Sequence, residues 1–150
     1  MNRFHGIFSV ILAGIALTIG VVAITRTNIP MGVFDLILIL AMFLIIIYSY
    51  CCKCPCREDR CGHVIFGKIT KMLPRRNQGK YLLTDILSVA GALMIIITFP
   101  QFWLFKHRVL FISFWTLLII AGVEIRFYVC TSCKNNQCTL CKNGGFKNKN

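Results

Sequence analysis

The sequence consists of four long runs of apolar residues separated by polar or basic segments. A bilayer core about 30 Å thick needs about 20 helical residues to cross it, and each run can supply one such helix. The predicted spans are 6–25, 31–50, 86–105 and 109–129. The pattern therefore predicts an all-α integral membrane protein with four transmembrane helices.

Few charged residues interrupt these runs, and they lie near span ends. The fourth run reaches full length only by passing Glu124 and Arg126, whose side chains can extend to the headgroups. We expect Asp35, Asp85 and Glu124 to be ordinary cap or pairing residues. Small residues predict close helix approach. These are Gly14 and Gly20 in the first span and Ser88, Gly91 and Ala92 in the third.

Composition supports the membrane assignment. Hydrophobic residues make up 57% of the chain and charged residues 15%, whereas a soluble domain averages about a quarter charged. The formal charge of +12 resembles that of a nucleic-acid-binding protein, but the charges lie in blocks between and after the apolar runs. We therefore expect no nucleic-acid partner.

The basic residues predict the orientation of the spans. Of the 17 Lys and Arg residues, all except Arg26, Lys106 and Arg108 lie at the N-terminus, in the central segment, or at and beyond the exit of the fourth span. Because short cytosolic segments are enriched in Lys and Arg, both termini and the central loop should face the cytosol, with the spans in the cell's inner membrane. We expect the first span to be retained: Val21 and Ala23 resemble a signal-peptide cleavage site, but the apolar stretch is longer than usual.

This topology divides the chain into two parts. Residues 1–129 form a four-helix membrane domain whose cytosolic loop, 51–85, is basic and rich in cysteine. Residues 130–150 form a cysteine-rich cytosolic tail. All nine cysteines fall in the loop and the tail. Since the cytosol is reducing, metal binding or redox chemistry is favoured over a disulfide framework.

The tail cysteines form two CxxC pairs within the stretch CTSCKNNQCTLC. They are Cys130, Cys133, Cys138 and Cys141. Two CxxC turns can supply the four thiolates of a tetrahedral site for zinc, for one iron or for an iron-sulfur cluster. Read from Cys133, the spacing also matches the first three ligands of a plant-type [2Fe-2S] centre. The alternative is a cluster of thiols without metal, or one used for lipidation.

The loop cysteines lie in the stretch CCKCPCREDRCGH. The candidate ligands there are Cys52, Cys54, Cys56, Cys61 and His63. They exceed what one tetrahedral centre needs, so the loop predicts a second site or a share in the tail site. For Cys51 and Cys52, which follow the second span directly, a buried thiol or a palmitoyl acceptor is an equally good interpretation.

A basic amphipathic segment follows the loop cysteines. Ile65, Ile69 and Met72 or Leu73 recur at helical spacing among lysines and arginines, and Pro74 ends the pattern. We expect a helix on the anionic headgroups of the bilayer. The alternative is a solvated loop whose charges only set the topology.

The sequence argues against a transmembrane haem. His5 lies at the inner edge of the first span and His107 at the outer edge of the fourth, so they cannot ligate one haem. The chain also has no phosphate-binding loop, paired carboxylates or nucleophile triad, and we expect no enzyme activity from it alone.

The layout resembles that of MerC-type mercury transporters, which are also small, four-spanning and cysteine-bearing at the cytosolic C-terminus. The first span of this chain lacks a cysteine pair to pass an ion through the bilayer, so no family is assigned. The leading hypothesis is a membrane metalloprotein with a cytosolic iron-sulfur or zinc centre. It would carry electrons to a membrane redox partner or serve as a docking subunit in assembly. The alternatives are a soft-metal ion carrier, a thiol-disulfide oxidoreductase and a lipid-anchored assembly factor.

Overall fold

The computed structural model describes residues 3–54, 64–74, 76 and 81–130. Within these ranges every regular element is helical and there is no strand, which confirms the predicted fold class. Four segments are long and apolar enough to cross a membrane: Phe4–Thr25, Ile29–Lys53, Leu83–Leu104 and Arg108–Val129. By length and composition they indicate an integral membrane protein.

The first two long helices are separated by a short turn. Helix α1 covers Arg3–Thr25 and α2 covers Ile29–Ser49. Asn28 caps α2 by accepting a hydrogen bond from the Met31 N–H at 3.2 Å, and Pro30 lies in the first turn. This cap starts α2 before the apolar run predicted from residue 31. A 3₁₀ turn, η1 (Cys51–Lys53), extends the segment beyond α2.

The second half of the chain has two further long segments. Helix α4 covers Leu83–Thr98, and the short helix α5 covers Gln101–Leu104 after Pro100. Helix α6 covers Arg108–Glu124 and passes into a π-helix, η3, at Ile125–Val129. Between the two halves lie the short helix α3 (Val64–Ile69) and the 3₁₀ turn η2 (Thr70–Met72).

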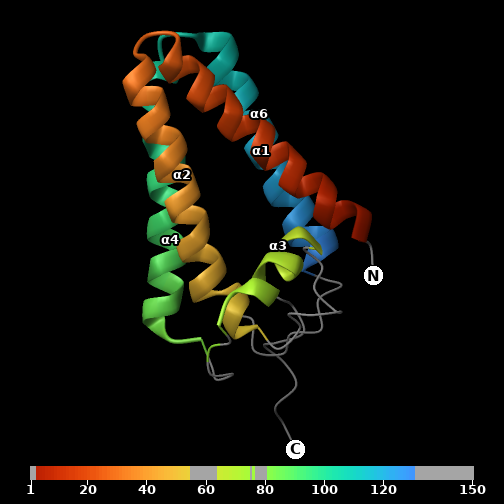
Figure 1. Cartoon of the computed structure of the whole chain (residues 1–150). Coiled ribbons are helices and arrows are strands. Elements are labelled where there is room, and N and C mark those ends of the chain that lie inside the picture. The colour runs from red at the N-terminus through yellow and green to blue at the C-terminus, as the bar shows by residue number, and fades with distance from the viewer. Residues whose placement is uncertain (1–2, 55–63, 75, 77–80, 131–150) are drawn as a thin grey trace, which may run out of the picture.

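The long helices pack as two antiparallel pairs, α1 with α6 and α2 with α4 (Figure 1). The pairs meet where the chain turns at residues 26–28 and 99–107, which we call the loop end, and diverge toward the opposite end. That opposite end, where α2 and α6 lead into Cys51 and Cys130, we call the cysteine end. There α3 lies between the pairs: it contacts α1, and Phe66 stacks on Phe43 of α2 at 6.1 Å.

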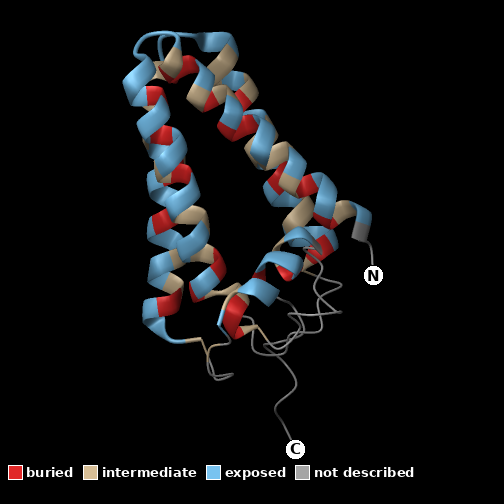
Figure 2. Ribbon diagram, viewed as in Figure 1, coloured by how far each residue is buried: buried red, intermediate tan, exposed pale blue. Residues whose placement is uncertain are grey.

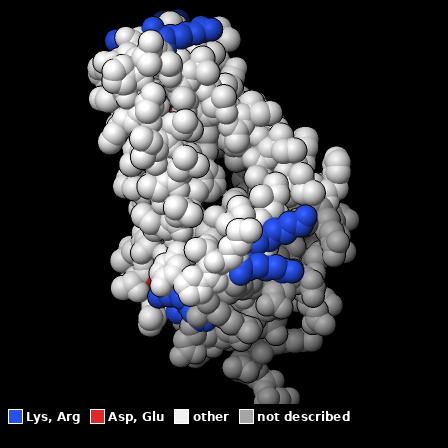
Figure 3. Space-filling view, viewed as in Figure 1, with Lys and Arg blue, Asp and Glu red and all other residues white. Residues whose placement is uncertain are grey.

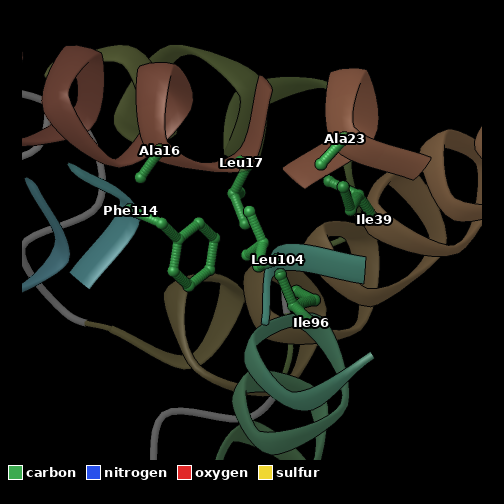
Figure 4. Close-up of a cluster of buried hydrophobic side chains, with 7 residues drawn as sticks. All are labelled: Ala16, Leu17, Ala23, Ile39, Ile96, Leu104 and Phe114. Carbon is green, nitrogen blue, oxygen red and sulfur yellow. The ribbon is translucent and has the colours of Figure 1, made fainter. Parts of the chain in front are cut away.

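A small apolar core joins the two pairs in the half of the molecule nearer the loop end (Figure 4). Its buried members are Ala16, Leu17, Ala23, Ile39, Ile96, Leu104 and Phe114. Outside this core, buried positions follow the lines where helices touch, and most outward positions are exposed (Figure 2). Exposed leucine, isoleucine and phenylalanine side chains along all four long helices suit contact with lipid.

Two glycines permit the closest helix contacts. At Gly32 an added Cβ would lie 3.0 Å from the Thr25 Cα and closer still to the Thr25 hydroxyl oxygen. At Gly20 it would lie 3.1 Å from Pro100 Cβ. Of the other small residues named above, Ala92 is buried, whereas a Cβ at Gly14 or Gly91 meets nothing within 4 Å. Close approach is therefore concentrated at the loop end.

Candidate metal centre

The first described cysteines lie where α2 ends. The Cys54 N–H donates a hydrogen bond to the Cys51 carbonyl at 3.2 Å, which closes the 3₁₀ turn. Cys51 and Cys54 are half-buried, but Cys52 is only 1% exposed. Burial of Cys52 agrees with the buried-thiol interpretation and leaves its predicted role as a ligand untested.

The first tail cysteine lies directly after the π-helix. Cys130 is half-buried, and its N–H donates to the Ile125 carbonyl at 2.8 Å, the five-residue spacing of a π-turn. The wider turn rotates the chain relative to a continued α-helix. It therefore sets the position of Cys130 at the end of the fourth long segment.

The other predicted ligands lie outside the described residues. They are Cys56, Cys61, His63, Cys133, Cys138 and Cys141. Among the residues that are described, no three His, Cys, Asp or Glu side chains gather closely enough to hold a metal ion. The structure does bring the starts of both cysteine groups to the same end of the molecule, as expected for antiparallel spans (Figure 1).

A buried ion pair closes the α2–α4 pair beside the loop cysteines. Lys53 donates to Asp85 Oδ2 at 2.7 Å, and their side chains are 7% and 3% exposed. Arg76 donates to the other carboxylate oxygen at 3.1 Å, and the Leu82 N–H donates to Oδ2 at 3.1 Å. Asp85 thus compensates two cations and also satisfies a backbone donor at the start of α4.

Aromatic rings surround this ion pair. Tyr50 and Tyr81 stack with centroids 4.3 Å apart, and the Lys53 ammonium lies 5.9 Å from the Tyr81 ring centre. The Arg76 guanidinium lies 5.1 Å from the ring centre of Tyr48. Contact of these cations with aromatic rings adds a favourable electrostatic interaction to the ion pair.

A second polar contact closes the α1–α6 pair at the same end. His5 Nδ1 lies 2.7 Å from Glu124 Oε2, and the imidazole stacks on Tyr128 of the π-helix at 4.4 Å. His107 precedes α6 at the loop end, so the two histidines lie at opposite ends as predicted. Glu124 and Asp85 are pairing residues, as expected from the sequence. Asp35 is different, because neither of its oxygens has a partner among the described residues.

The basic segment after the loop cysteines is helical from Val64 and ends before Pro74. It turns Gly67 and Thr70 inward, where both are buried. The predicted apolar positions Ile65, Ile69 and Met72 are instead exposed, and they lie beside the exposed Lys68 and Lys71. This outward surface is apolar on one side and cationic on the other, as an interfacial helix requires.

Sequence reasoning missed the Lys53–Asp85 pair, although a signal was present. Lys53 follows the second span and Asp85 precedes the third, so two opposite charges lie at one membrane depth on antiparallel neighbours. Comparison of this chain with protein-family models, curated proteins and solved structures gives no match.

Proposed function

We propose that this chain is a membrane metalloprotein whose cysteines hold an iron-sulfur or zinc centre at the cysteine end. The observation that carries the proposal is that α2 and α6, which belong to different helix pairs, lead into the two cysteine groups at the same end of the molecule. Nine thiols confined to two short stretches of the sequence exceed what packing requires, and clustered thiolates favour soft metals.

The surroundings support a stable scaffold for such a centre. The Lys53–Asp85 pair fixes the end of α2 against the start of α4, and His5 fixes α1 against Glu124 at the end of α6. Both helices that lead into cysteines are therefore held close to where the thiols begin. Because the helices that lead into the ligands are already held in place, less conformational entropy is lost when a metal binds.

In the proposed orientation, the protein lies in the cell's inner membrane and its cysteine end faces the cytosol. On the face shown in Figure 3, basic side chains gather toward the two ends, and the surface between them shows none. The loop end has Arg26, Lys106 and Arg108, and the sequence assigns all the other Lys and Arg residues to the cysteine end. This asymmetry favours a cytosolic cysteine end, where Lys68 and Lys71 would contact anionic headgroups.

Anaerobic purification, followed by metal and sulfide analysis and absorption spectroscopy, tests the proposal. Iron with sulfide and visible charge-transfer bands would support electron transfer with a membrane redox partner. Zinc in a colourless protein would support a docking subunit. Each single serine substitution at a tail cysteine should lower metal occupancy, because loss of one ligand opens a four-thiolate site. The four substitutions are at Cys130, Cys133, Cys138 and Cys141.

The loop cysteines supply the internal comparison. Replacing Cys54, Cys56 and Cys61 together should lower metal per chain if the loop adds a site or ligands, whereas unchanged stoichiometry confines the metal to the tail. Protein that is folded yet holds no soft metal after anaerobic preparation would overturn the proposal. Rapid exchange of the bound ion, with uptake into vesicles, would instead identify a carrier.

A further inference from the structure

Asp35 is a buried carboxyl group inside a membrane span. It lies on α2 within the apolar segment Ile29–Lys53, and the residue is 1% exposed. Neither carboxyl oxygen has a hydrogen-bond partner within the described part of the chain. Asp85 and Glu124, by contrast, each contact a basic or imidazole side chain.

The face of α2 that bears Asp35 is packed on both sides. One turn toward the loop end, Gly32 contacts Thr25 of α1. One turn toward the cysteine end, Ile39 belongs to the core cluster with Ala23 of α1 (Figure 4). Asp35 therefore lies at the level where the two helix pairs meet.

The elements packed around this level offer no compensating charge. In the sequences of helices α1, α4 and α5, the charged or titratable residues are Arg3, His5 and Asp85, which belong to the helix turns nearest the cysteine end. At the loop end, Arg26, Lys106, His107 and Arg108 are exposed, and none forms an ion pair with Asp35 in the described structure. A charged carboxylate here would bear a large desolvation penalty without compensation.

We propose that Asp35 is a reversible proton-binding site within the membrane span, with its exchange route on the loop end. A proton satisfies a carboxylate through one covalent bond to oxygen. A metal cation such as sodium or calcium would need several further oxygen ligands. Among the described residues, neither Asp35 oxygen has a hydrogen-bond partner, and no three His, Cys, Asp or Glu side chains gather closely enough to hold a metal ion. The geometry therefore favours a proton over a metal ion.

The route to the loop end is short. Asp35 lies six residues after the first residue of α2, which corresponds to about 9 Å along a helix that rises 1.5 Å per residue. Release of the proton would leave an unpaired charge where α1 and α2 touch, and hydration of that charge requires the contact to loosen. Proton occupancy and the packing of the two helix pairs are therefore coupled.

A hydrophobic carbodiimide tests this proposal on the full chain in vesicles. Dicyclohexylcarbodiimide takes up the proton of a neutral carboxyl group, and the carboxylate then adds to its central carbon, giving an O-acylisourea that rearranges to a stable N-acylurea. Peptide mass spectrometry should locate the adduct at Asp35. Labelling should fall as the pH of the medium is raised, because the reaction consumes the protonated form.

Three variants keep the result interpretable. Asp35→Asn should abolish the adduct, Asp35→Glu should retain it, and Asp85→Asn should leave the Asp35 adduct in place. Folding is checked in each case by helix content and by a single peak in gel filtration. Absence of the adduct from folded wild-type protein would overturn the proposal. Protection by sodium at constant pH would also overturn it, because a metal ion would then be the ligand.

Discussion

The Lys53–Asp85 pair should dominate the stability of the cysteine end. In Asp85→Asn, the buried Lys53 ammonium loses its counter-charge, and the loss of one partner of a buried pair costs about 3–5 kcal/mol. We take about 3 kcal/mol, since the pair lies at the ends of the helices near the headgroups. Lys53→Met should cost less, because Asp85 keeps its bonds to Arg76 and to the Leu82 N–H.

Cys52 provides the assay, because it is buried next to Lys53. In chelator-treated protein, its alkylation requires local opening of η1, so the labelling rate follows the opening equilibrium. A loss of about 3 kcal/mol corresponds to roughly a hundredfold faster labelling in Asp85→Asn. Mass spectrometry compares the labelling of Cys52 with that of the half-buried Cys51, whose rate should change less. As a control, Thr84→Asn changes an exposed residue next to Asp85 and should leave both labelling rates unchanged.

The double variant Lys53→Met/Asp85→Asn makes the reasoning refutable. It removes both buried charges, so it should be more stable than Asp85→Asn alone, and the two effects should be clearly non-additive. Equal labelling of wild type and Asp85→Asn would show that the pair contributes nothing. Additive effects of the two substitutions would show that neither single variant leaves an uncompensated buried charge, which would refute the reasoning.

Three further outcomes are expected. Gly32→Ala should lower the free energy of unfolding by about 1–3 kcal/mol through overlap with Thr25, whereas Gly14→Ala, which meets open space, should be neutral in detergent unfolding. Glu124→Gln should cost no more than about 1 kcal/mol in the same assay, because its contact with His5 is partly exposed, and a larger loss would mean that the contact sets the fold. A membrane-impermeant thiol reagent should label Cys130 in inverted vesicles and not in intact cells, and labelling from outside would reverse the proposed orientation.

The number and type of the long helices could be predicted from hydropathy, because a helix needs about 20 apolar residues to cross a bilayer and such runs are easily recognised. The residues at which the helices begin could not be predicted in this way. Hydropathy places the second and third spans at residues 31 and 86, whereas α2 begins at Ile29 and α4 at Leu83. Asn28 and Asp85 satisfy the first backbone N–H groups, and such polar caps lie outside an apolar pattern.

Helix pairing was also beyond the sequence. Antiparallel spans can pack in several orders with the same hydropathy, and the order here depends on local shape, such as the fit of Gly20 against Pro100. For the candidate site, the two cysteine groups stand out in the sequence, and antiparallel spans predict that the groups begin at the same end, as the described Cys51, Cys52, Cys54 and Cys130 do. The ion pair beside them has a sequence signal, two opposite charges at the facing ends of consecutive spans, but only the observed packing of α2 against α4 shows that the two charges meet.

The ion pairs and the cysteines act on different contacts at the cysteine end. Lys53 and Asp85 join α2 to α4, and His5 and Glu124 join α1 to α6, so each contact lies within one helix pair. The loop cysteines continue from one pair and the tail cysteines from the other. Helix α3 already contacts both pairs where they diverge. A metal shared by loop and tail would add a second connection there, whereas a metal held by the tail alone would not. Whether the loop contributes ligands thus decides whether metal binding strengthens the link between the helix pairs or acts only on the tail.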